Sequence, residues 1–125
     1  DGRTALMQAS GFGHGAIVMA LLQAGADIDK VNIKGATALM MASKKGHAAI
    51  VEALIQAGAD IDKATNNGAT ALIAASQEGH PAIAQALIQA GADVHSFHGI
   101  VALIVAYRDG HSAIVKLLED ASAAG

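Results

Sequence analysis

The chain has 125 residues, of which 53% are hydrophobic, 15% are charged and only 2% are aromatic. The high apolar share excludes a disordered chain, and the formal net charge of −3 argues against nucleic-acid binding through a basic surface. The length fits one domain, and the 30 alanines and 14 glycines predict small packing units that approach closely.

The chain lacks the residues and segments that thiol chemistry, secretion and membrane insertion require. It has no cysteine, which removes disulfides, thiol catalysis and Cys-based zinc sites. Its longest apolar runs, Ala16–Leu22 and Ile100–Ala106, have about seven residues, against about 20 needed to cross a bilayer. No secretory signal is visible, and the start at Asp1 indicates a processed, excised or engineered terminus. We therefore expect an intracellular protein that does not bind membranes.

The sequence repeats itself with a period of 33 residues. Residues Gly2–Lys34 and Gly35–Asn67 are identical at 22 of 33 positions, and two further copies follow. A Gly-His pair recurs at this spacing, but its last copy arrives after 31 residues. The two missing residues fall between Asp93 and Gly99, so we expect a shorter last loop and helices of unchanged length. We call the copies the first to fourth units, with approximate bounds 2–34, 35–67, 68–98 and 99–125.

Each unit begins with a short predicted helix, for which the second unit gives the pattern. Thr37 is the expected N-cap and Gly46 the expected end. Between them, Ala38, Leu39 and Ala42 place small or apolar side chains on one side.

A second helix is predicted from about Ala48 to Ala57, and Gly58 stands where a left-handed C-cap belongs. The polar segment from Asp60 to Asn67 is expected to form a protruding loop. Because such short helices are not stable alone, stability must come from stacking of neighbouring units. The amphipathic pattern of the second helix is carried by Ile50, Val51, Leu54 and Ile55.

These units resemble the ankyrin repeat, a family with a 33-residue period and a T-P-L-H-x-A opening. The Gly-His, Ile-Val and Gly-Ala-Asp elements also match, and the resemblance covers essentially the whole chain. Departures are an alanine in place of the family's proline and Met or Ile in place of its histidine. The resemblance implies an all-α solenoid of stacked helix–turn–helix units with protruding hairpin-like loops, in one domain spanning 1–125. The opening motif reads Thr4-Ala5-Leu6-Met7, Thr37-Ala38-Leu39-Met40, Thr70-Ala71-Leu72-Ile73 and Val101-Ala102-Leu103-Ile104.

The histidines do not predict a metal site. Stacked units lie about 10 Å apart, whereas zinc ligands lie about 2.1 Å from the ion. His95 and His98 share the shortened loop with no carboxylate or thiol beside them, so we predict no metal and no cofactor. The histidines that recur once per unit are expected to hydrogen-bond at the turn between helices, and they are His14, His47, His80 and His111.

Recurring aspartates predict turn capping, because they return at unit spacing. No nucleophile–base pair, phosphate-binding loop, dinucleotide fingerprint or zinc motif is present. We therefore expect no catalytic residues and no enzyme activity. The aspartates are Asp27, Asp60 and Asp93, and then Asp29 and Asp62.

The resemblance places the recognition surface on the loop tips and on the concave face of the first helices. Apolar side chains beside lysines at these positions predict a protein or peptide partner with an apolar anchor and some negative charge. The expected binding residues are Arg3, Gln8, Phe12, Ile33, Lys34, Met41, Lys44, Lys45, Asn66, Asn67, Gln77, Glu78, Phe97, His98, Ile100, Arg108 and Asp109, with Gly11, Ala36, Ala69, Ala74 and Val105 beside them.

The two ends of the array differ. Ile17 keeps the internal pattern, so no N-terminal cap is expected, and either further repeats precede or the first unit self-associates. Tyr107 stands where earlier units have serine, and no following unit would crowd it. Glu119 is typical of a C-terminal cap, because its position is occupied in earlier units by Leu22, Ile55 and Ile88.

Three other interpretations stay open. One is an engineered or consensus-like ankyrin binder or scaffold, although Met7, Met40 and Ile73 vary at a framework position, which favours natural drift. A second is a structural spacer that self-associates through its uncapped first unit. The third is an enzyme or metal protein.

Overall fold

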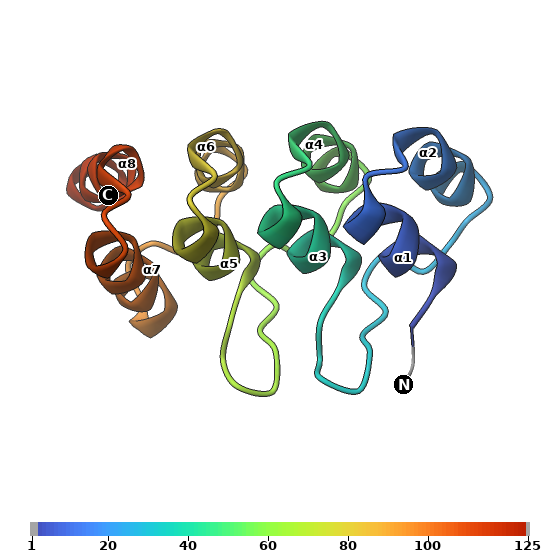
Figure 1. Cartoon of the computed structure of the whole chain (residues 1–125), viewed down its shortest axis with the longest axis horizontal. Helices are drawn as coiled ribbons and strands as arrows, with labels where there is room; N and C mark the ends of the chain where they lie inside the picture. The colour runs from blue at the N-terminus through green and yellow to red at the C-terminus, as the bar shows by residue number, and fades with distance from the viewer. Residues whose placement is uncertain (1–2, 125) are drawn as a thin grey trace.

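The computed structural model describes residues 3–124, which form eight helices in four consecutive pairs (Figure 1). The expected first boundary at Gly2 and the terminal residues Asp1 and Gly125 lie outside this range. The first helices of the units are α1 (Ala5–Phe12), α3 (Ala38–Lys45), α5 (Ala71–Glu78) and α7 (Phe97–Arg108). The second helices are α2 (Gly15–Gln23), α4 (Ala48–Gln56), α6 (Pro81–Gln89) and α8 (Ser112–Ala124).

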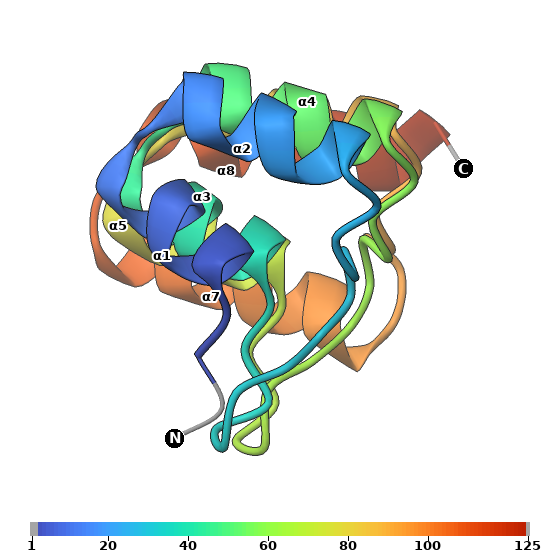
Figure 2. The ribbon, with the colours of Figure 1, turned by 90° about the vertical axis from the view of Figure 1, so that its right-hand side faces the viewer.

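The helices form two layers that run along the length of the molecule. The first helices line up in one layer and the second helices in the other, while the loops hang from the side of the first helices (Figure 1, Figure 2). Contacts between units run mainly along the row α1, α3, α5 and α7. The predicted all-α solenoid is confirmed.

The first helices of the first three units begin and end as predicted. Thr37 Oγ1 accepts a hydrogen bond from the N–H of Met40 at 3.3 Å, and Thr4 and Thr70 cap their helices in the same way. Gly46 ends α3 with φ +87°, a left-handed conformation that glycine adopts without steric cost. Helix α4 likewise ends within one residue of its expected end.

The core consists of small and aliphatic side chains. The buried hydrophobic residues of the described chain are Ala, Leu, Ile, Val and Met, without an aromatic ring. Ala42, Ala75 and Ala106 have no exposed surface, which allows neighbouring helices to approach closely. The three aromatic residues lie on the surface, and they are Phe12, Phe97 and Tyr107.

Histidines connect each unit to the preceding one. His47 Nε2 lies 3.2 Å from the carbonyl oxygen of Gly11. His80 and His111 make the same contact, at 3.0 Å and 3.1 Å, with carbonyl oxygens of the units before them. These three histidines therefore make the hydrogen bond that the sequence predicts at a turn between helices. The carbonyl oxygen that accepts it belongs to the preceding unit and not to the histidine's own unit.

Asp27, Asp60 and Asp93 cap turns as expected, whereas Asp29 and Asp62 accept hydrogen bonds from the following unit. Asp60 Oδ1 accepts from the N–H of Asp62 at 3.2 Å, which is the predicted turn contact. Asp29 Oδ1 accepts from the N–H of Asp60 at 2.8 Å, and Asp62 Oδ1 from that of Asp93 at 2.9 Å. One set of carboxylates, Asp27, Asp60 and Asp93, thus fixes the local turns, and the other, Asp29 and Asp62, fixes the spacing of units.

The loops before α3 and α5 are hairpin-like. In the first, the N–H of Asn32 donates to Ala36 O at 3.1 Å and the N–H of Gly35 donates back to Asn32 O at 2.9 Å. The second loop repeats this pattern, and the N–H of Asn66 donates to Lys34 O of the first loop at 2.9 Å. The two loops therefore stand side by side as one protruding edge (Figure 2).

The connection before α7 differs from the prediction. The shortened segment forms an additional helical turn, so α7 spans 12 residues where α1, α3 and α5 span eight. Gly99 is buried in this turn, where a Cβ atom would lie 2.3 Å from the carbonyl of Val94. With two residues fewer, the chain cannot form the hairpin and enters the helix early. Phe97, His98 and Ile100 therefore lie in a helix, and their predicted place at a loop tip was wrong.

Candidate functional site

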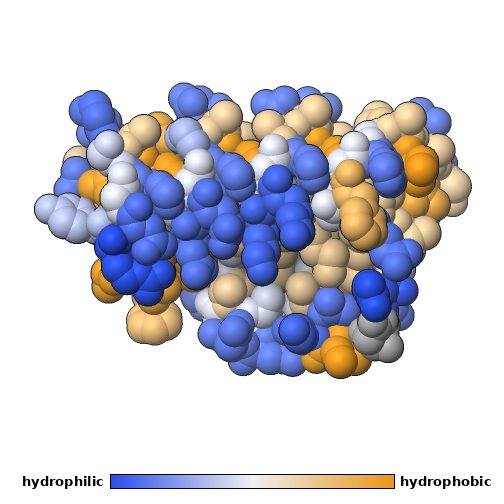
Figure 3. All heavy atoms as spheres, viewed as in Figure 1, coloured by the Kyte–Doolittle hydropathy of each residue, from blue (hydrophilic) through white to orange (hydrophobic). Residues whose placement is uncertain are grey.

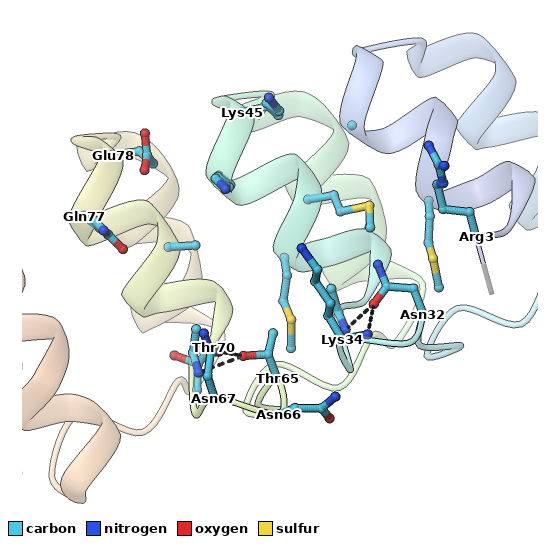
Figure 4. A pocket seen from close by; sticks show the side chains of 18 of the residues that line it. Arg3, Asn32, Lys34, Lys45, Thr65, Asn66, Asn67, Thr70, Gln77 and Glu78 are labelled. Carbon is cyan, nitrogen blue, oxygen red and sulfur yellow. Dashed lines mark hydrogen bonds between the residues drawn. The ribbon is translucent and has the colours of Figure 1, made fainter. Parts of the chain in front are cut away.

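A groove with a volume of about 790 Å³ crosses the first three units (Figure 4). It lies between helices α1, α3 and α5 on one side and the two hairpin-like loops on the other. Figure 3 shows hydrophobic surface here between the hydrophilic side chains of the helices and those of the loops.

The inner surface of the groove is lined by methionines and small residues. Met7 and Met40 are almost fully buried beneath it, and Met41 is half-buried. Phe12 also lines the groove and is 71% exposed. Methionine side chains are flexible and adapt to irregular apolar surfaces. The groove can therefore accommodate apolar side chains of different shapes.

The charge of the groove is opposite to that of the chain. Four of the eight basic residues line it, together with one of the 11 acidic residues, Glu78. Its formal charge is thus +3, against −3 for the whole chain. The basic residues include Arg3 before α1, Lys34 at the loop side and Lys45 at the end of α3 (Figure 4). The fourth, Lys44, precedes Lys45 in the last turn of α3.

Two loop residues that the sequence did not indicate hold the lower edge of the groove. Asn32 Oδ1 accepts from the N–H groups of Lys34 at 2.9 Å and Ala36 at 3.0 Å. Thr65, one unit later, accepts from the N–H of Ala69 at 3.0 Å. In the sequence, these two positions could have been recognised as an Asn or Thr that stands three residues before a turn glycine. Further lining residues missed at the sequence level are Met7, Met40 and Thr70.

The structure brings together most of the expected binding residues that precede Phe97. Among these, Ile33 is the exception, because it lies at the tip of the first loop, 69% exposed and outside the groove. Those that line the groove are Arg3, Gln8, Gly11, Phe12, Lys34, Ala36, Met41, Lys44, Lys45, Asn66, Asn67, Ala69, Ala74, Gln77 and Glu78.

The expected binding residues from Phe97 onward do not line the groove. The extra turn of α7 replaces the loop that would have continued the lower edge. Arg108 Nε lies 3.0 Å from Asp109 Oδ1, and this hydrogen bond lowers the pKa of Asp109. Arg108 and Asp109 therefore form an ion pair with each other on the surface. The residues that lie apart from the groove are Phe97, His98, Ile100, Val105, Arg108 and Asp109.

Residues 3–124 contain no group of three or more His, Cys, Asp or Glu side chains that could hold a metal ion. None of their helices is long and apolar enough to span a bilayer.

The family comparison agrees with this architecture. A family model for ankyrin repeats in three copies matches residues 6–98 and, in a second match, residues 62–124. The chain belongs to the ankyrin-repeat family. Ankyrin repeats are generally protein–protein interaction modules, and the family is typically non-enzymatic. No curated protein matches this ankyrin-repeat chain.

Proposed function

We propose that this chain is a non-catalytic module that binds a protein segment or peptide in the groove across its first three units. The observation that carries the proposal is the combination of an apolar inner surface and a +3 charge in one groove of an acidic chain. The partner is an extended segment with a large apolar residue and neighbouring carboxylates.

The apolar residue of the partner packs among the methionines beside Phe12. An aromatic ring that is 71% exposed loses much of its contact with water when a ligand covers it. Because Met7 and Met40 are held in the core, they form a fixed base, while Met41 adapts to the ligand.

The carboxylates of the partner lie near the lysines. Among residues 3–124, Lys34, Lys44 and Lys45 form no ion pair, and all three are exposed. Their charges raise the rate at which an acidic segment arrives and favour it over a basic one. Binding is therefore expected to weaken as the salt concentration rises.

Selection from a library of random linear peptides tests this function. Peptides retained by the purified chain should carry Asp or Glu close to Leu, Met or Phe. Enrichment of basic peptides, or of peptides without acidic residues, would contradict the proposal.

A charge-matched pair of variants assigns the preference to the groove. The variant Lys34→Glu/Lys44→Glu/Lys45→Glu should lose the acidic preference. The control Lys30→Glu/Lys63→Glu/Lys116→Glu changes the net charge equally outside the groove and should keep it.

A single domain over residues 1–125 with the four unit bounds of the sequence repeat is part of this proposal. Four helix pairs in one continuous stack support it. An intracellular setting stays a prediction that rests on the absence of cysteine.

A further inference from the structure

Methionine carries all the sulfur of the chain. The sequence has four methionines and no cysteine, so no thiol of the chain competes with them for an oxidant. Their exposure differs widely, because Met7 and Met40 are 1% and 6% exposed, whereas Met41 is half-buried and Met19 is 47% exposed. A dilute oxidant therefore reaches Met19 and Met41 before the other two.

Met41 combines this accessibility with a place in the groove. It lines the groove from α3, whereas Met19 lies on α2 and outside the groove. The α1 residue that faces Met41 is Gly11, on which an added Cβ atom would lie 3.8 Å from Met41 Cβ. Because glycine has no side chain, α1 leaves Met41 uncovered at this point. The equivalent positions of the other units hold no methionine.

We propose that Met41 is a site of oxidation by peroxides, and that its sulfoxide weakens binding of the partner in the groove. The thioether sulfur attacks one oxygen of hydrogen peroxide, the O–O bond breaks, and the second oxygen leaves as water with both protons. The sulfur is oxidised by two electrons and gains an S=O bond, while the peroxide is reduced. Methionine sulfoxide reductases reverse the change. The oxidation is independent of the proposed function, whereas its effect on binding rests on that function.

The sulfoxide oxygen opposes binding in two ways. It makes an adaptable apolar side chain polar, so the apolar residue of the partner would have to cover the new dipole. It is also a hydrogen-bond acceptor beside a lysine, because Lys45 follows Met41 by four residues on α3, and residues four apart lie on the same side of a helix. A lysine that donates to the sulfoxide is less available for a carboxylate of the partner.

Peptide mapping by mass spectrometry tests the site. In dilute hydrogen peroxide, Met19 and Met41 should be oxidised at least about tenfold faster than Met7 and Met40, because the buried pair reacts only when the structure opens. In concentrated urea the four rates should converge. Oxidation of Met41 no faster than that of Met7 and Met40 in the folded chain would overturn the assignment.

Two matched variants assign the effect on binding to the groove. Met19→Leu leaves Met41 as the more exposed of the three remaining methionines, and Met41→Leu leaves Met19. Each variant is measured before and after peroxide treatment, by fluorescence anisotropy with one acidic peptide from the library selection. Treatment should raise the dissociation constant of Met19→Leu at least about tenfold and leave that of Met41→Leu unchanged. A methionine sulfoxide reductase should restore the affinity of Met19→Leu.

The outcomes distinguish this inference from the proposed function. Failure of the untreated chain to bind acidic peptides would contradict the proposed function. An unchanged affinity of Met19→Leu once mass spectrometry shows Met41 oxidised, or an equal loss in both variants, would contradict the effect of Met41 on binding. Far-UV circular dichroism should be the same before and after treatment, since a loss of helicity would mean that oxidation unfolds the chain and does not act in the groove.

Discussion

His47 of the second unit hydrogen-bonds the carbonyl oxygen of Gly11, 36 residues earlier, through Nε2 at 3.2 Å. Its ring rests on Gly13, where an added Cβ atom would lie 2.8 Å from Cε1. The left-handed glycine therefore has two roles, because it ends α1 and leaves room for the imidazole of the next unit. This pairing of glycine and histidine recurs at the two following contacts between units and sets their spacing.

Replacing His47 with alanine should destabilise the stack. The change removes a hydrogen bond between units and the packing of the ring, and we expect a loss of about 1–2 kcal/mol in the free energy of unfolding. His14→Ala is the control, because His14 is exposed and has no preceding unit to bind in the described chain. Its expected effect is below about 0.5 kcal/mol. Urea titrations followed by circular dichroism compare the two, and equal losses would show that the contact between units contributes nothing.

Gly46→Ala should cost more than Gly58→Ala. Both glycines have positive φ, +87° and +94°, so both variants strain the backbone by about 1–2 kcal/mol. Only at Gly46 would the new Cβ meet another residue, the ring of His80, at 2.8 Å. In a His80→Ala background this excess should vanish, which a double-mutant cycle measures as a coupling of about 1 kcal/mol. Strict additivity of the two substitutions would contradict the shared role.

Two glycines inside helices predict effects of opposite sign. Gly99→Ala should destabilise α7 by about 2 kcal/mol or more, because the new Cβ would meet the Val94 backbone at 2.3 Å. Gly11→Ala in α1 meets only Met41 Cβ at 3.8 Å and should stabilise by about 0.5–1 kcal/mol through higher helix propensity. Thermal unfolding checks both directions. A neutral Gly99→Ala would mean that the early start of α7 is not fixed by this close contact.

The architecture could be predicted because its signals are local and repeated. Thr37 and Gly46 mark a helix through contacts within a few residues, and the 33-residue period shows that such helices stack. The partner of His47 could not be predicted in the same way, since its acceptor belongs to another unit.

The start of α7 shows where spacing alone fails. The shortened repeat showed that two residues are missing, but not that the remaining ones would join the helix. That outcome depends on Gly99 packing against Val94, which is a contact in space. In the candidate site too, some features could be predicted from the sequence and others depend on contacts in space. Positions such as Lys44 and Met41 were predicted from the place that the family resemblance gives them on the first helices, whereas the end of the groove at the third unit depends on the missing loop.

The binding affinity of one selected acidic peptide for two triple variants tests the central claim most directly. The groove variant is Phe12→Ala/Met41→Ala/Lys45→Ala, and the control variant is Ile104→Ala/Tyr107→Ala/Lys116→Ala, which removes the same kinds of side chain elsewhere. Fluorescence anisotropy should give a dissociation constant at least about tenfold higher for the groove variant and an unchanged one for the control. Helicity of both variants should match that of the unmodified chain. If the peptide binds the correctly folded groove variant as tightly as the control, the groove is not the recognition surface.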